Sequence, residues 1–166
     1  MTDTQKKPLW KNELVWLFLL TSGLFAILYS KFILGGYAYV FTDTGADTMQ
    51  INYAQYGLFS SLFRSGESGY VLQAGLGMDV SSYYPAYLIP YNLLILLAPQ
   101  RLLPWAVLAS AYLKMITISL VGYLFYRKLM QDGIGTMAAA LAWTFSGYVI
   151  LWGQHYGFCT CMALFT

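Results

Sequence analysis

The stretch PWAVLASAYLKMITISLVGYLFYRK at residues 104–128 decides the fold class, because it is long, apolar and closed by two basic residues. Residues 104–126 contain a single charged side chain, that of Lys114. A helix needs about 20 mostly apolar residues to cross about 30 Å of hydrocarbon, so this stretch predicts a membrane-spanning helix. A short turn at 127–133 follows, and the charge-free run at 134–152 predicts a second span.

Apolar stretches flank this pair on both sides. Residues 14–41 are longer than one crossing, with Lys31 as their only charge, and no small-x-small cleavage site follows them, so we expect a span rather than a signal peptide. A turn at 153–157 leads into a fourth apolar run at 158–166, which stops after less than half a crossing. We therefore expect this chain to be the N-terminal part of a longer polytopic protein.

Composition agrees with a membrane protein and excludes a nucleic-acid partner. Charged residues are 10% of the chain and apolar residues 58%, against about 25% charged in an average soluble domain. The net charge of +2 supplies no basic field for a phosphate backbone.

The few charges also predict an orientation. Three lysines within residues 1–13 place the N-terminus in the cytoplasm, which puts the 42–103 loop outside. The helix expected at Tyr84–Ala98 is short and interrupted by prolines, so we interpret it as re-entrant or interfacial, which leaves the basic turn at 127–133 inside. The sequence thus predicts an all-α, polytopic transmembrane protein with interfacial helices in a large first external loop.

The 42–103 loop holds most of the acidic side chains. Asp43, Asp47 and Gln50 fall at i, i+4 and i+7, which is one face of a helix, and Arg64 is the single base of the segment 42–83. Residues 49–63 have apolar side chains at helical spacing, as in a helix lying in the membrane interface. A connector that rests on lipid, with its acids facing water, is an equally good interpretation on composition alone.

Two side chains outside the loop are candidates for binding. Lys114 is near the middle of its span, where a cation costs roughly 2.5–3.5 kcal/mol, so it must face protein or water. It could pair with a donor phosphate or form a structural ion pair with another helix. His155 is the only histidine and lies at the external end of the third span; a proton-transfer or phosphate contact competes there with the simpler role of an interfacial residue.

Seven short motifs follow one another from residue 47 onward. They are Asp47-x-x-Gln50, Gly66, Gly75-x-Gly77, Tyr83-Tyr84-Pro85, Pro90-Tyr91-Asn92-Leu93-Leu94, Lys114 and Phe145-Ser146-Gly147-Tyr148. In order and spacing this set resembles the bacterial YfhO-type membrane proteins, which are related to the GT-C glycosyltransferases. The resemblance implies the N-terminal portion of a GT-C-like fold in the bacterial cell membrane. It also implies transfer of sugar from a polyprenyl-phosphate donor to a cell-wall polymer such as teichoic acid, on the outer face.

The resemblance also implies roles for the site residues. An acid in the first external loop is central to catalysis in GT-C enzymes, and Asp47 is its best positional counterpart, with Asp43 close behind. Asp47 would remove the proton from the acceptor hydroxyl, or bind Mg²⁺ or Mn²⁺ together with Asp43. With Gln50 these acids are an incomplete ligand set, so the cofactor stays open. The substrate-binding candidates are Gln50, Arg64, Lys114 and His155.

Partners and an alternative follow from the same features. We expect membrane lipid, a polyprenyl-phosphate sugar and the C-terminal helices of the same protein as partners, and the chain alone to be catalytically incomplete. The alternative is a small non-enzymatic membrane protein, such as a flippase for polyprenyl-linked sugars or a transport subunit. A loop of roughly 60 residues is far longer than such a protein needs between two spans, which favours the enzyme.

Overall fold

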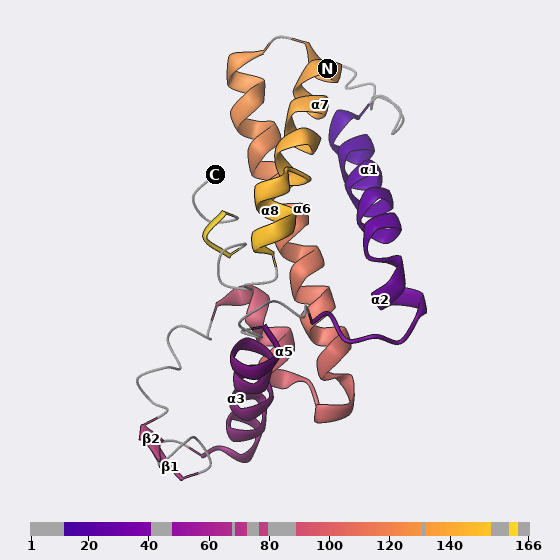
Figure 1. Cartoon of the computed structure of the whole chain (residues 1–166). Coiled ribbons are helices and arrows are strands. Elements are labelled where there is room, and N and C mark those ends of the chain that lie inside the picture. The colour runs from indigo at the N-terminus through magenta and orange to yellow at the C-terminus, as the bar shows by residue number, and fades with distance from the viewer. Residues whose placement is uncertain are drawn as a thin grey trace, which may run out of the picture.

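The computed structural model describes residues 12–40, 48–67, 69–72, 77–79, 89–130, 132–153 and 160–162. The chain is mostly helical, as predicted (Figure 1). Two helical stretches are long and apolar enough to cross a membrane, Gln100–Leu129 with 30 residues and Gly133–Trp152 with 20, and Glu13–Leu28 is a shorter apolar helix.

The first helical stretch is divided into two. Helix α1 (Glu13–Leu28) begins where the Asn12 side chain accepts a hydrogen bond from the Leu14 N–H at 3.0 Å. The helix is interrupted at Tyr29 and continues as the short α2 (Ser30–Leu34). It ends at the glycine pair, where Gly36 has a φ of 68° that other residues rarely adopt, and irregular chain follows to Val40.

The two long stretches form an antiparallel pair. A 3₁₀ turn, η5 (Gln100–Leu102), leads into α6 (Leu103–Leu129), and the chain returns through α7 (Gly133–Thr144) and α8 (Gly147–Trp152). Helices α7 and α8 are separated at Phe145, and Ser146 begins α8 by accepting a hydrogen bond from the N–H of Val149 at 3.4 Å. The start of α1, the end of α6 and the start of α7 lie together at one end (Figure 1).

The other end of α6 carries the segments that we call the loop elements. These are η2 (Thr48–Tyr53), a π-helix; α3 (Ala54–Ser65); the strands β1 (Tyr70–Val71) and β2 (Met78–Asp79); the 3₁₀ turn η4 (Pro90–Asn92); and α5 (Leu93–Leu97). The antiparallel β1–β2 ladder was not expected from a sequence that predicted only helices.

Side chain to backbone hydrogen bonds join α3 to the segment between α5 and α6. The Ser60 hydroxyl donates to the Ala98 carbonyl at 2.7 Å, and the Gln100 amide donates to the Gly57 carbonyl at 2.8 Å. Phe59 of α3 and Leu96 of α5 are fully buried in the core between the two helices. Helix α3 is therefore packed against α5 and the turn that leads into α6.

Polar side chains join α1 to α6 along their length. The Thr21 and Ser119 hydroxyls, both buried, are hydrogen-bonded at 2.8 Å. At the end shared by the two helices, the Tyr123 hydroxyl donates to the Glu13 carboxylate at 2.5 Å, and Arg127 lies 3.8 Å from the same carboxylate.

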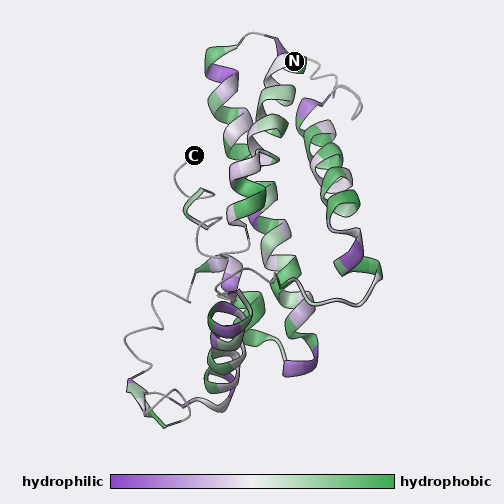
Figure 2. Cartoon of the chain, viewed as in Figure 1, coloured by the Kyte–Doolittle hydropathy of each residue, from purple (hydrophilic) through white to green (hydrophobic). Residues whose placement is uncertain are grey.

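The outer faces of the helices are apolar. Hydrophobic residues cover most of α1 and much of the α6–α7 pair, and hydrophilic residues gather at helix ends and on α3 (Figure 2). Large side chains such as Ile27 (71% exposed), Ile134 (74%) and Leu151 (70%) have no covering neighbours in the part of the chain that the structure describes. Exposed apolar faces of this extent are typical of surfaces that contact lipid or another protein.

Candidate functional site

A cavity lies where the loop elements meet the helices. Its lining comes from five parts of the chain: Tyr29 and Tyr39 on either side of α2, Tyr56 of α3, Ile95 of α5, Val107, Ser110, Ala111, Lys114 and Met115 of α6, and Val149 and Gly153 of α8 and its end. Its volume is about 10 Å³, room for about one water molecule. Together with the space through which it opens outward, the empty volume is about 350 Å³.

Lys114 supplies the positive charge of this cavity. Its side chain is 2% exposed, so the cation faces protein, as its place in an apolar helix demands. No acidic residue is among those that line the cavity. A lysine ammonium has three N–H donors, and a buried one needs acceptors for all of them.

Ser110 lies one helical turn before Lys114 and on the same face of α6. It is 1% exposed, and its hydroxyl oxygen has no hydrogen-bond partner among the described residues. A serine in a helix can usually donate to a carbonyl of the preceding turn, as the hydroxyl of Thr117 does to that of Leu113 at 2.9 Å. The Ser110 hydroxyl therefore gives this face of the cavity a polar group that can form a hydrogen bond with a ligand.

Tyrosine rings form the opposite walls, and their neighbours hold them in place. The Tyr29 ring stacks on Phe25 at 4.3 Å and meets the ring of Tyr39 edge-on at 5.3 Å. The Tyr56 hydroxyl donates to the side-chain oxygen of Asn92 at 3.3 Å. Tyr39 is 1% exposed although it lies in irregular chain, so these contacts fix the position of the chain around Tyr39.

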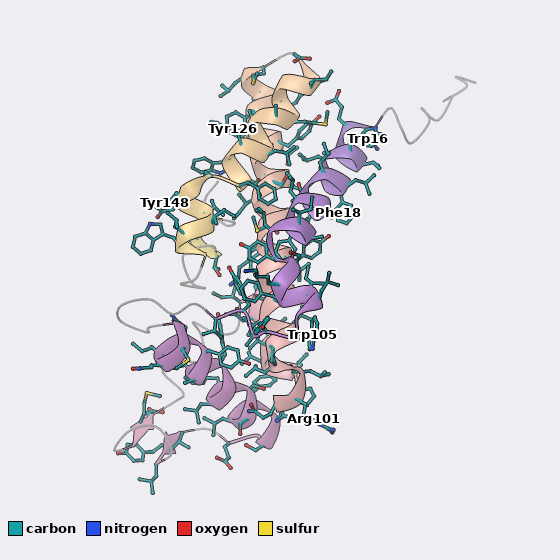
Figure 3. All side chains as sticks on the ribbon, turned by 45° about the vertical axis from the view of Figure 1, so that its right-hand side comes forward. Trp16, Phe18, Arg101, Trp105, Tyr126 and Tyr148 are labelled. Carbon is teal, nitrogen blue, oxygen red and sulfur yellow. The ribbon has the colours of Figure 1, made fainter. Side chains whose placement is uncertain are left out.

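Aromatic side chains also mark the ends of the helices. Trp16, Trp105 and Tyr148 extend outward from α1, α6 and α8, respectively (Figure 3), and each is 45–50% exposed. Along α6, Trp105 and Tyr126 are separated by about 32 Å at about 1.5 Å per residue. Aromatic belts of membrane helices lie about 30 Å apart, at the two edges of the hydrocarbon.

The structure brings few of the sequence candidates together. Gln50 is exposed in the π-helical η2, and Arg64 is exposed near the end of α3, where its Nε donates to the Ser60 carbonyl at 3.3 Å; neither lines the cavity with Lys114. Asp43, Asp47 and His155 lie outside the described residues, as does most of the fourth apolar run. Of the helix expected at Tyr84–Ala98, residues 84–88 lie outside the described ranges, and the rest forms η4 and α5.

Other features of the site were not predicted. Ser110 and the three cavity tyrosines were not expected from the sequence. The spacing of Ser110 four residues before Lys114 was the one signal that could have indicated the serine. Within the described ranges no three His, Cys, Asp or Glu side chains gather as metal ligands, and the proposed pair of acids for Mg²⁺ or Mn²⁺ lies outside those ranges.

The arrangement can bind an anion beside an apolar chain. A buried cation and an orphaned hydroxyl lie on one helix face, and the remaining walls are aliphatic or aromatic. Comparison of the chain with models of protein families, with curated proteins and with solved structures finds no match.

Proposed function

We propose that this chain belongs to a multi-pass membrane glycosyltransferase of the YfhO type, GT-C-like, which uses a polyprenyl-phosphate sugar as donor for a cell-wall polymer. The observation that carries the proposal is the buried Lys114 in a cavity between the loop elements and α6. A lipid-linked donor presents a phosphate and a hydrocarbon chain at the membrane boundary. A cation walled by apolar side chains is suited to both parts of such a molecule.

The membrane placement rests on two features. The outer faces of α1, α7 and α8 expose large apolar side chains, and Trp105 and Tyr126 are separated by about one hydrocarbon thickness along α6. Glu13 and Arg127 are 3.8 Å apart, so the N-terminal end of α1 and the turn after α6 share a side. Basic residues lie near the N-terminal end of α1 and near the turn after α6 in the sequence. We therefore assign that side to the cytoplasm, and the loop elements to the outer face of the bacterial cell membrane.

The chemistry proposed is displacement of the lipid phosphate from the sugar C1 by an acceptor hydroxyl. The leaving phosphate gains negative charge, which a nearby cation stabilises, and Lys114 is the candidate for that contact. Asp47 is the proposed base for the hydroxyl proton. It belongs to residues 41–47, which join Val40, next to the cavity residue Tyr39, to the first residue of η2.

The test is Asp47→Asn in the protein expressed at full length, with transfer of labelled sugar from polyprenyl phosphate as the readout. We expect activity to fall at least about a hundredfold, the contribution of a positioned base, while expression and membrane insertion persist. Glu67→Gln is the matched control, since Glu67 is an exposed acid of the same loop. Asp47→Asn protein with full activity contradicts the assignment.

A second candidate is a non-enzymatic flippase or transport subunit for polyprenyl-linked sugars. The interrupted helices favour it. The break at Tyr29 borders the cavity, and α8, which follows the α7–α8 break, contributes Val149 to its lining. Discontinuous helices frame many transporter sites. The test follows a fluorescent polyprenyl-phosphate sugar as it crosses the bilayer of proteoliposomes. Crossing that Asp47→Asn does not affect, without any sugar transfer, would favour this candidate over the enzyme.

A further inference from the structure

We infer that Ser110 and Lys114 together bind one oxygen of a lipid phosphate, with the aliphatic and aromatic cavity walls receiving the adjoining part of the lipid. This inference rests on the proposed function for the identity of the lipid, a polyprenyl phosphate. The pairing of these two residues follows from the structure of the cavity itself.

The first argument is the orphaned hydroxyl. Ser110 is 1% exposed and unpaired among the described residues, and a buried hydroxyl without a partner is destabilising. Replacing it with alanine would remove that penalty without making a large void. Its presence is accounted for if a ligand supplies the missing acceptor.

The second argument is the charge beside it. Lys114 lies four residues further along the same face of α6 and is 2% exposed. Its ammonium has three N–H donors. A hydroxyl donor and an ammonium on adjacent turns of one helix face can reach the same acceptor atom, and an anionic oxygen would satisfy both at once.

The third argument is the size and polarity of the space. The enclosed part, about 10 Å³, admits one oxygen-sized atom, so the rest of the head group lies in the part that opens outward. Ile95, Val107 and Met115 line the same cavity. Aliphatic walls favour a phosphate that carries a hydrocarbon chain over inorganic phosphate, which prefers a fully polar site.

The test measures equilibrium binding to the whole protein in detergent, without sugar or acceptor. Undecaprenyl phosphate is the probe, undecaprenol is its uncharged counterpart, and sodium phosphate represents the free anion. We expect Ser110→Ala to weaken binding of undecaprenyl phosphate about tenfold, as for a lost hydrogen bond to a charged group, and Lys114→Gln about a hundredfold. Undecaprenol should bind weakly and be insensitive to both substitutions.

A matched variant separates binding from folding. Ser119→Ala, on the same helix, breaks the hydrogen bond to Thr21 and should lower thermal stability while leaving the affinity unchanged. Ser110→Ala should unfold at the same or a higher temperature than the wild type in the absence of lipid, because it removes an unpaired hydroxyl. A loss of affinity without a loss of stability thus supports a ligand contact.

Two results would overturn the inference. Equal affinities of wild type, Ser110→Ala and Lys114→Gln for undecaprenyl phosphate would mean that the cavity holds only a water molecule. Equal affinities for undecaprenol and undecaprenyl phosphate would mean that the phosphate does not contribute to binding. If only sodium phosphate binds, and its affinity falls in both variants, Ser110 and Lys114 still bind a phosphate oxygen. The ligand would then be a free anion and not a lipid. Since no sugar transfer is measured, inactivity of the enzyme would leave these results unchanged.

Discussion

The hydrogen bond between Thr21 and Ser119 allows a quantitative test of how α1 and α6 are joined. The two hydroxyl oxygens are 2.8 Å apart, and both side chains are at most 1% exposed. Thr21→Val and Ser119→Ala each break the bond and leave a buried hydroxyl unpaired, which costs about 1–3 kcal/mol. The double variant leaves no unpaired hydroxyl, so its unfolding free energy should fall by less than the sum of the decreases in the two single variants.

The difference is the coupling energy, and its size depends on the surroundings. Hydrogen bonds between membrane helices couple by about 0.6 kcal/mol on average and at most about 1.7 kcal/mol, so we expect a value in this range. Unfolding of the protein in bicelles, followed by denaturant titration, measures all four variants. Thr117→Val is the control, because its hydroxyl bonds only within α6. Additivity to within about 0.3 kcal/mol would refute the direct contact.

Three further changes test other parts of the structure. Asp132→Ala removes both acceptor oxygens that begin α7 and should lower the unfolding free energy by about 1 kcal/mol, whereas Asp132→Asn keeps one acceptor oxygen and should lower it less. A Cβ at Gly122 would lie 3.4 Å from the Trp143 ring, so Gly122→Ala should be tolerated and Gly122→Leu should cost about 1–3 kcal/mol in the same assay. Burial raises the pKa of Tyr53 above 10.0, so its contribution to stability is complete below pH about 10 and is lost as the pH rises toward the folded-state pKa. Tyr53→Phe should therefore flatten the alkaline part of a stability–pH curve, and an unchanged curve would argue against burial.

Hydropathy predicted the long helices because the length and apolar content of a segment are local properties. The apolar run at 104–126 lies within α6, and the run at 134–152 spans α7 and α8. The interruptions at Tyr29 and Phe145 were not predicted, since neither position has a proline and both lie within apolar runs. Contacts with side chains beyond the helix, such as the edge-on contact of Tyr29 with Tyr39, accompany the first interruption.

The candidate site was predictable only in part, for a similar reason. A lysine in the middle of an apolar helix predicts its own burial, because the alternative is a cation in lipid. The sequence carries no comparable signal for Ser110 or Tyr39, whose importance comes from neighbours distant in the chain. Gln50 and Arg64 were grouped with the site by polarity and spacing, which do not determine where a loop side chain points.

The π-helical turn at Thr48–Tyr53 has a consequence for how sequences of this kind should be aligned. A π turn holds one residue more than an α turn, and such turns often lie beside functional sites. Removing one residue between 48 and 53 would convert the turn to ordinary α geometry and leave the residues before Thr48 nearly in phase with α3, because the wider turn accommodates the extra residue. Asp47 immediately precedes this turn in the sequence, so an acid that precedes a single-residue gap in a relative should be aligned with Asp47.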